Sequence, residues 1–316
     1  MDSGSKRPLK VGACIPVVEG EMDGGSARGA DMVAMARMAE AVGFDSVWIP
    51  DHLLIYDEGR DPQGAWECGA LLGALAVATS RVEIGALVMA TSFRNPTLLA
   101  KIADTVDELS GGRFILGLGT GRHEPEHRAY GYPFDRQVDR FEEALEIIIP
   151  LLREGHVDFH GAYYSAHECQ LHPRGPRRSG PPILIGALGT GPRMLQLTAR
   201  YADIWNGWLT WGRSWPDAIP PIRQKIDAAC QSVGRDPSSL ERTVAILVEV
   251  PGQQARLVST SPTGSGEPLT GSADVIAEAL RGFAREGIGH IQIVHAPNSV
   301  AGIEAFAPIL EYLDRG

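Results

Sequence analysis

The chain has 316 residues, of which 44% are hydrophobic and 22% are charged, an ordinary globular composition with ample material for a core. Asp and Glu outnumber Lys and Arg by 39 to 29, and the net charge of −10 argues against a broad nucleic-acid-binding surface. No segment approaches the roughly 18 consecutive apolar residues that a membrane helix needs. We therefore expect neither a nucleic acid nor a membrane as partner.

The amino terminus, MDSGSKRPLK, carries no apolar run behind its charges and so does not resemble a secretory signal. The cysteines are far apart and form no C-x-x-C pair: they are Cys14, Cys68, Cys169 and Cys230. Isolated thiols of this kind are typical of a reducing compartment. We expect a cytoplasmic protein whose thiols are reduced and mostly structural.

Short β-rich runs alternate with longer helical patterns along the chain. The predicted strands lie at 9–15, 44–50, 81–90, 113–121, 181–187, 202–208, 242–250 and 290–296. The predicted helices lie at 28–43, 66–80, 95–112, 137–155, 192–200, 215–233, 273–286 and 301–313. Strands that are separated by helices run parallel, with right-handed crossovers. This order favours a single α/β domain, 1–316, folded as a (β/α)₈ TIM barrel, with a doubly wound open sheet as the alternative.

Two stretches interrupt the alternation. Residues 156–173 indicate an inserted hairpin that turns at Gly161. Residues 251–271 are polar and rich in Ser, Gly and Pro, which predicts a mobile loop after the seventh strand. That loop is either a lid over the catalytic face or an excursion without function.

The segment GLGTGRHEPEH, residues 117–127, contains a glycine-rich loop after the fourth strand. It is not a dinucleotide fingerprint, because Arg122 stands where the third glycine belongs and the loop does not follow the first strand. At the carboxyl end of a barrel strand, glycines let the backbone approach a ligand and turn N–H groups toward an anion. A helix that starts near Pro125 adds its positive end. The alternative is a tight turn without a ligand.

The second half of the segment has the letters of a zinc-protease helix, H-E-x-x-H. That motif needs both histidines on one helical face. Pro125 lies between them, so the helix can begin only about there and His123 precedes it. We therefore expect no metal here, and we expect His127 to be a solvated helix residue.

Several segments together resemble the luciferase-like monooxygenase superfamily, whose members are flavin- or deazaflavin-dependent (β/α)₈ barrels. They are AVGFDSVWIPDHL (41–53) and residues 80–121, 124–148, 181–206 and 269–293. Within the superfamily, the chain looks most similar to the branch that uses coenzyme F420, a 5-deazaflavin. The resemblance also suggests a homodimer.

The resemblance implies roles for particular residues. Asp51 and His52 match a pair beside the ring, where the histidine passes a proton near the reacting carbon. Leu87 and Val88 match a non-prolyl cis peptide that supports the back face of the ring. Two phosphate- or tail-binding loops are matched by Gly119, Thr120 and Gly121 and by Gly186, Ala187 and Gly189.

The sequence departs from the family pattern after the first glycine loop. Sugar-phosphate dehydrogenases of this group carry a catalytic Glu there and many other relatives carry Trp, whereas this chain has Arg122 followed by His123. An arginine cannot act as a general acid or base near neutral pH, which puts that activity in doubt. Arg122 is instead a candidate clamp for an anionic substrate or for the phosphate and glutamate tail of the cofactor, with a surface arginine as the alternative. His123 and Arg193, just past the second loop, are further candidate cofactor contacts.

The residue chemistry supports a site without the resemblance. A histidine titrates near neutral pH, and His52 ends a strand at the face where barrel enzymes do chemistry, although a structural role is the alternative. Asp51 is expected to accept backbone N–H groups. Trp208 and Trp211 follow the sixth strand and are candidate walls of an apolar substrate pocket, with the core as the alternative.

The sequence therefore predicts an oxidoreductase that transfers a hydride between coenzyme F420 and a small organic substrate, with the hydride chemistry supplied by the cofactor. Because no acid follows the glycine loop, reduction of an activated double bond is favoured over alcohol oxidation. The first alternative is a reduced-FMN-dependent monooxygenase, which would need a flavin reductase as a partner. The others are a non-catalytic binder of a flavin-like ligand and a metal hydrolase.

Overall fold

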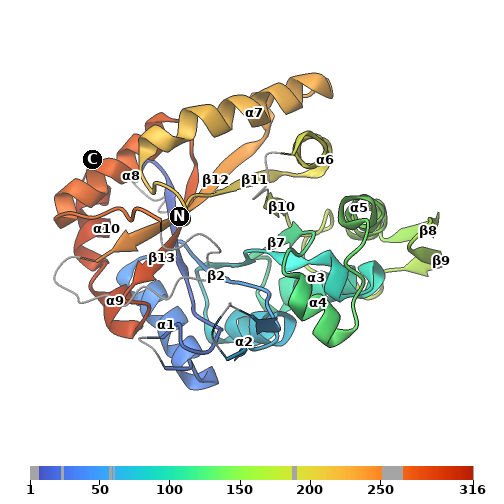
Figure 1. Cartoon of the computed structure of the whole chain (residues 1–316), viewed down its shortest axis with the longest axis horizontal. Coiled ribbons are helices and arrows are strands. Elements are labelled where there is room, and N and C mark those ends of the chain that lie inside the picture. The colour runs from blue at the N-terminus through green and yellow to red at the C-terminus, as the bar shows by residue number, and fades with distance from the viewer. Residues whose placement is uncertain are drawn as a thin grey trace.

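The structure is a computed structural model that describes residues 7–22, 25–56, 59, 61–186, 191–250 and 266–315. Parallel strands form a closed barrel, because each pairs with the next and β10 also pairs with β7 (Figure 1). In order they are β1 (Lys10–Cys14), β2 (Ser46–Ile49), β5 (Glu83–Ala86), β7 (Phe114–Gly119), β10 (Ile183–Gly186), β11 (Ile204–Trp208), β12 (Glu241–Glu249) and β13 (His290–Ala296). The predicted TIM barrel is confirmed, and the open sheet is excluded.

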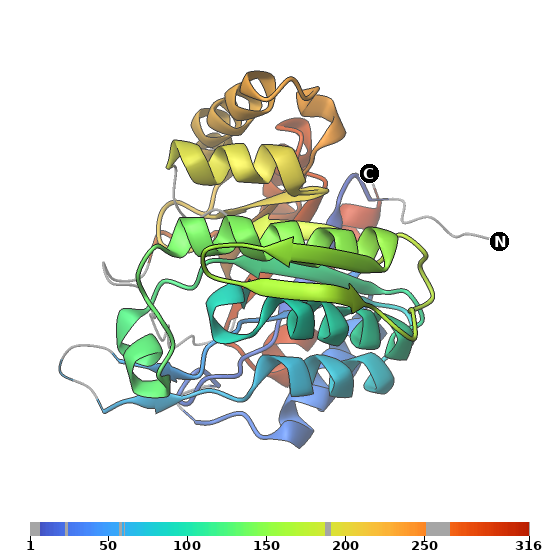
Figure 2. The same ribbon diagram turned by 90° about the vertical axis from the view of Figure 1, so that its right-hand side faces the viewer.

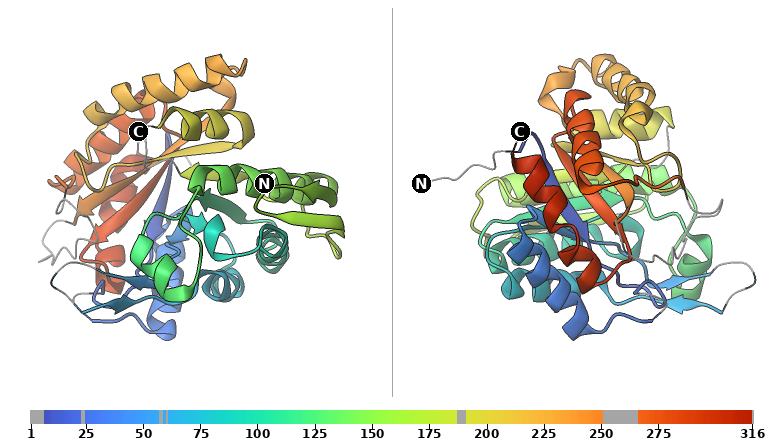
Figure 3. Two further views of the ribbon diagram at one scale, coloured as in Figure 1. Left: turned by 45° about the vertical axis from the view of Figure 1, so that its right-hand side comes forward. Right: turned by 90° about the vertical axis from the view of Figure 1, so that its left-hand side faces the viewer.

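Helices surround this barrel, and Figure 3 shows α9 beside α1 and α10 beside α8. They are α1 (Gly29–Val42), α2 (Cys68–Ala78), α3 (Pro96–Leu109), α5 (Gln137–Glu154), α6 (Pro192–Tyr201), α7 (Ile219–Ser232), α8 (Ala273–Arg285), α9 (Val300–Glu304) and α10 (Ala307–Asp314). None of the helices in the described part of the chain has the length and hydropathy that a membrane span requires.

Local sequence explains where these helices begin and end. The apolar residues at helical spacing in α1, among them Met32 and Met35, are its buried face, and the helix ends at Gly43 with a left-handed φ of 101°. The side chain of Asn95 caps α3 by accepting the N–H of Thr97, with Pro96 in the first turn.

Smaller elements lie at the ends of the barrel strands. The predicted strand 81–90 is divided into β5 and β6 (Met89–Ala90), and the peptide bond between Leu87 and Val88 is cis, as the resemblance implied. A short helix, α4 (Glu124–Tyr130), follows β7, and an antiparallel pair, β3 (Leu54–Ile55) and β4 (Gln63–Gly64), follows β2. Single 3₁₀ turns lie at Thr91–Phe93, Pro216–Ala218 and Pro237–Ser239.

The predicted insertion is an antiparallel hairpin of β8 (His156–His160) and β9 (Ser165–Gln170). It lies along the outer side of α5 (Figure 2), and its buried residues Val157 and Ala166 join the main hydrophobic core. The predicted loop at 251–271 falls mostly on residues 251–265, which lie outside the described residues.

The barrel interior is filled around the indole of Trp48. A Cβ atom on Gly85 would lie 2.1 Å from the Trp48 ring, so only glycine leaves room for that ring. The indole N–H donates to Ser46 Oγ at 2.7 Å, and the same hydroxyl pairs with His290 Nε2 at 2.7 Å. Trp48 and its hydrogen-bonded partners therefore fill part of the barrel interior.

Candidate active site

A cavity of about 410 Å³ lies at the carboxyl ends of the barrel strands. Every barrel strand contributes to its lining, through residues at or near the end of the strand. One residue from each is Cys14, Ile49, Leu87, Gly119, Gly186, Trp208, Leu247 and Val294. The volume suits a small ligand, and this is the face where barrel enzymes hold their catalytic residues.

Asp51 lines the cavity, and neighbouring groups hold its carboxylate in the cavity wall. Its buried carboxylate accepts the N–H of Ala90 at 2.8 Å and both Nη atoms of Arg94, at 2.6 and 2.9 Å. Burial alone would lower the pKa of Arg94, but the Asp51 carboxylate outweighs burial and raises it. The expectation that Asp51 accepts a backbone N–H is confirmed, and the bidentate pair with Arg94 fixes the loops after β2 and β6.

His52 lines the cavity and forms a pair with Glu126, a residue of α4 that the sequence analysis missed. The distance from His52 Nδ1 to Glu126 Oε1 is 3.0 Å, and Glu126 Oε2 accepts the N–H groups of Leu53 and Leu54 at 3.0 and 3.3 Å. The imidazole is 24% exposed and the carboxylate 1% exposed, so the ring faces the cavity while its partner is shielded.

The contacts of Glu126 fix its charge. Burial alone would raise the pKa of Glu126, but the hydrogen bond and charge of His52, with the N–H groups of Leu53 and Leu54, hold that pKa below its usual value. A carboxylate accepts hydrogen bonds only, so the proton of a neutral His52 ring resides on Nδ1 and the lone pair on Nε2. The pair is therefore arranged to exchange a proton at Nε2.

A second acidic residue that the sequence analysis missed, Glu21, lines the same cavity. Its Oε2 atom accepts the N–H groups of Val17 and Val18, both at 3.2 Å. Burial raises the pKa of Glu21, and these two N–H groups and the charge of His52 oppose that rise only in part. Burial, with a smaller contribution from Glu21, raises the pKa of Cys14 to about 12, so this cavity thiol stays protonated.

The glycines of the first loop make room for the protein itself. A Cβ atom on Gly119 would lie 2.7 Å from Val88 Cγ2, and one on Gly186 would lie 3.0 Å from Val88 Cγ1. Both glycines thus accommodate the bulge at Leu87 and Val88, which lines the cavity. Gly121 has a φ of 75°, which favours glycine. Thr120 also lines the cavity, whereas Ala187 and Gly189 lie outside the described residues.

Arg122 and the two candidate tryptophans meet at one side of the cavity. The Arg122 guanidinium lies 4.3 Å from the centroid of the Trp211 ring, and the Trp211 and Trp208 rings pack edge to face at 5.9 Å. All three residues line the cavity. This wall therefore combines aromatic surface with a positive charge.

The other predicted contacts have partners of their own. His123 directly precedes α4, and its Nε2 accepts the N–H of Tyr56 at 2.9 Å. Arg193 forms ion pairs with Asp139 and Glu142 on the outside of the barrel, and it is not among the described residues that line the cavity. Two carboxylates therefore hold its guanidinium, whereas the sequence predicts a contact with an anionic cofactor.

The prediction of a solvated His127 is wrong. The side chain is fully buried: Nδ1 lies 2.9 Å from the carbonyl oxygen of His123, Nε2 lies 2.8 Å from Ser92 Oγ, and the ring packs on Phe93 and Phe134. Helix α4 begins at Glu124, as Pro125 predicted, and covers the end of the barrel, which buries this histidine.

Two polar atoms of the cavity show what a ligand must offer. Trp208 Nε1 and Asn298 Oδ1 are buried and have no hydrogen-bond partner within the described part of the chain, and both residues line the cavity. Such atoms are costly unless a ligand or water pairs with them. A flat ring with both carbonyl and N–H groups on its edge, such as a flavin or deazaflavin, fits this donor and acceptor and the apolar wall.

Curated proteins are similar to this chain in sequence. A pyrimidine monooxygenase, RutA, of Cronobacter sakazakii is 33% identical over 178 residues, which cover 55% of this chain and 51% of the relative. An F420-dependent glucose-6-phosphate dehydrogenase of Amycolatopsis mediterranei is 32% identical over 228 residues, which cover 68% of this chain and 64% of the relative. The chain thus spans about half of the first relative and just under two thirds of the second.

A solved structure and a family profile agree with these relatives. An F420-dependent secondary alcohol dehydrogenase, solved in complex with an F420–acetone adduct, has the same fold, with a TM-score of 0.76 at 20% identity over 96% of this chain and 99% of that one. The sequence profile described as luciferase-like monooxygenase matches residues 9–290, nearly the whole chain. The chain belongs to the luciferase-like monooxygenase family.

Proposed function

We propose that the protein is an oxidoreductase that uses coenzyme F420 and a small organic substrate in this cavity. The observation that carries the proposal is the His52–Glu126 pair, which sets a proton-exchanging imidazole in the wall of an apolar cavity. When bound, the deazaflavin ring supplies or accepts the hydride. The protein then has to hold the ring and the substrate and to move one proton.

Several residues would hold the cofactor. Leu87 and Val88 form an apolar wall for one face of the ring, and Trp208 Nε1 and Asn298 Oδ1 offer a donor and an acceptor to its edge. Arg122 supplies a positive charge for the acidic tail of F420. The F420-dependent relatives support the same choice.

His52 would move the proton. In a reduction, the protonated ring donates its Nε2 proton to the substrate as the hydride arrives, and the charge of Glu126 stabilises the imidazolium beforehand. In an oxidation, neutral His52 accepts the proton of a substrate hydroxyl at the same atom. Because Arg122 stands in place of an acid after the glycine loop, we favour reduction of an activated double bond.

A reduced-FMN-dependent monooxygenase is the second candidate, because pyrimidine monooxygenases are among the relatives. That function would require a flavin reductase as partner. In both cases we propose a cytoplasmic homodimer that acts on a small molecule.

Titration of the protein with oxidised F420 and with FMN, followed by quenching of tryptophan fluorescence, tests the choice. We expect tight F420 binding that weakens at high ionic strength, because the acidic tail is screened. Arg122→Ala should weaken F420 binding by about tenfold, whereas Arg128→Ala, an exposed residue of α4, should leave it unchanged. Preference for FMN would overturn the proposal and make oxygen the next reagent to test.

A second arm tests the role of His52. His52→Ala should retain F420 binding and lower turnover by about 100-fold, because general acid–base catalysis contributes at least that much. Unchanged turnover with the cofactor bound would remove His52 from the mechanism.

A further inference from the structure

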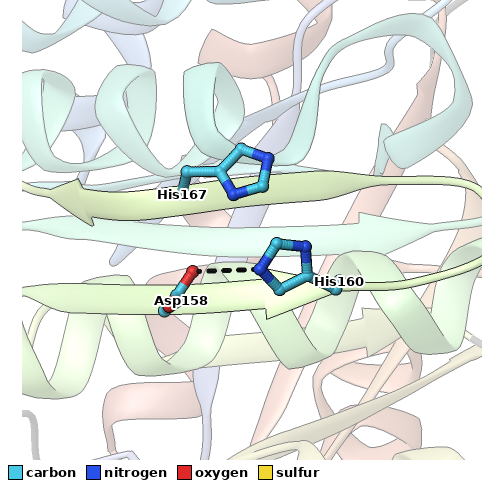
Figure 4. Close-up of side chains that lie close together, drawn as sticks. All are labelled: Asp158, His160 and His167. Carbon is cyan, nitrogen blue, oxygen red and sulfur yellow. Dashed lines mark ion pairs between the residues drawn. The ribbon is translucent and has the colours of Figure 1, made fainter.

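Three side chains of types that can ligate a metal ion lie close together on the outer face of the hairpin β8–β9, away from the active-site cavity. Asp158 and His160 come from β8 and His167 comes from β9 (Figure 4). One ligand atom from each residue lies within 4.8 Å of those of the others. His160 Nε2 is 3.5 Å from Asp158 Oδ1, and the two imidazole centroids are 4.4 Å apart.

The strand pattern explains why these side chains share a face. Val157 is buried toward α5, so its neighbour Asp158 points outward, and His160, two positions further on, shares that direction. On β9, the buried Ala166 places the adjacent His167 on the outer face. The hairpin thus presents two imidazoles and one carboxylate on its exposed side.

A β-bulge brings His167 toward Asp158. Val157 pairs with Cys169 and Phe159 with Ala166, so β9 carries one extra residue between these two pairs. Glu168 takes up that extra residue with a φ of 43°, and its N–H donates to Asp158 Oδ1 at 3.4 Å. The bulge therefore lets two residues of β9, His167 and Glu168, lie opposite Asp158.

We propose that Asp158, His160 and His167 form a surface site for a divalent metal ion of the Zn²⁺ type, which would clamp β8 to β9. Two imidazoles with one carboxylate suit Zn²⁺, Cu²⁺ or Ni²⁺, whereas Mg²⁺ and Ca²⁺ prefer oxygen ligands throughout. Because the three side chains are exposed, a fourth coordination position of the metal ion is open to water. The net charge of −10 also favours a cation.

The geometry requires only side-chain movement. Tetrahedral Zn²⁺ with bonds of about 2.0–2.2 Å sets its ligand atoms about 3.4 Å apart. The pair of His160 and Asp158 is already near this separation at 3.5 Å, and the remaining ligand distances, which are at most 4.8 Å, need to shorten by about 1.4 Å at most. The side chains of His160 and Asp158 are 65% and 60% exposed, so they can rotate without displacing the core.

Zinc uptake by the untagged, full-length protein tests the site, with a chromophoric chelator as competitor. We expect His160→Ala and His167→Ala each to weaken binding of one Zn²⁺ equivalent by about tenfold or more. The matched controls are His156→Ala, an exposed residue earlier on β8, and His172→Ala, whose ring pairs with Gln170 at 3.1 Å. Neither control should change the affinity, and all four residues are exposed, so the variants should fold.

Electron paramagnetic resonance of the Cu²⁺-loaded protein gives an independent measurement. Nitrogen couplings should show two imidazole ligands in the wild type and one in either single variant. The chain has nine histidines, so the site of binding needs this check. Absence of zinc uptake, or uptake that is unchanged when His160 and His167 are both replaced, would overturn the proposal.

Discussion

His52 Nδ1 lies 3.0 Å from Glu126 Oε1, although the two residues are 74 positions apart in the chain. The other oxygen of the carboxylate accepts the N–H groups of Leu53 and Leu54, which directly follow His52. Glu126 thus holds both the imidazole and the backbone beside it. This double attachment makes Glu126 a positioning residue whose charge also supports a protonated His52.

Replacement of this carboxylate should impair proton transfer more than binding. Glu126→Gln keeps the shape of the side chain but removes the charge that favours the imidazolium, so we expect turnover to fall by about 100-fold. F420 binding should stay unchanged, a difference between turnover and binding that a purely structural defect would not produce. Glu124→Gln, at an exposed position of the same helix, should change neither quantity. An equal loss of turnover in the Glu126→Gln and Glu124→Gln variants would contradict the role of Glu126 as the residue that positions His52.

The Asp51–Arg94 pair should matter for stability. Asp51→Asn leaves the largely buried Arg94 guanidinium without its main counter-charge, so we expect the free energy of unfolding to fall by about 3 kcal/mol. Glu67 also pairs with Arg94 but is 48% exposed, and Glu67→Gln should cost less than about 1 kcal/mol. Urea denaturation of both variants measures the difference, and equal losses would show that burial of Asp51 is not decisive.

Local patterns in the sequence predict the barrel but only one residue of the His52–Glu126 pair. The alternation of strands and helices, the buried face of α1 and the start of α4 near Pro125 all depend on near neighbours, and the structure confirms them. His52 is predictable because it follows closely on the carboxyl end of a barrel strand. Its pairing with Glu126 depends on where α4 lies relative to the barrel. Neither the spacing of motifs nor the periodicity of apolar residues in the sequence predicts that contact.

The same physical reason accounts for the error at His127 and for the role of Gly119. A charged, proline-containing stretch looks solvated, yet α4 covers the barrel end and buries His127 against Phe93. The glycine loop looks like a ligand cradle, whereas the absent Cβ of Gly119 leaves room for Val88. Both outcomes come from contacts between distant segments, which one sequence does not reveal.

Gly119 should therefore be intolerant of even a methyl group. A Cβ at this position would lie 2.7 Å from Val88 Cγ2, so Gly119→Ala should cost about 1–3 kcal/mol of unfolding free energy and disturb the cavity wall. Adding Val88→Ala removes the clashing methyl groups and should restore part of that loss. Gly29→Ala, where a Cβ meets nothing within 4 Å, serves as the control. A stable Gly119→Ala protein would show that the bulge can move.

Two buried histidines should make the fold sensitive to mild acid. Burial lowers the pKa of His290 and of His295 to about 3, and Lys10 adds to the effect at His290. The unfolded chain binds these protons near pH 6.5, whereas the native state stays neutral, so unfolding takes up protons. The contribution of these two histidines to the free energy of unfolding is therefore fully present above about pH 6.5. It is lost as the pH falls toward about 3, at up to about 1.4 kcal/mol per pH unit for each histidine.

Substitution of His295 isolates half of this effect. Its ring packs against Phe44 and Phe306, and neither of its nitrogens has a hydrogen-bond partner among the residues that the structure describes. His295→Phe keeps the ring contacts and removes the titrating group, so the stability lost between about pH 7 and about pH 5 should shrink by about 2 kcal/mol. Urea denaturation at the two pH values measures this difference, with the exposed His172→Phe as the control. An unchanged loss would mean that His295 is protonated in the native state, which would require an acidic or water partner beside it.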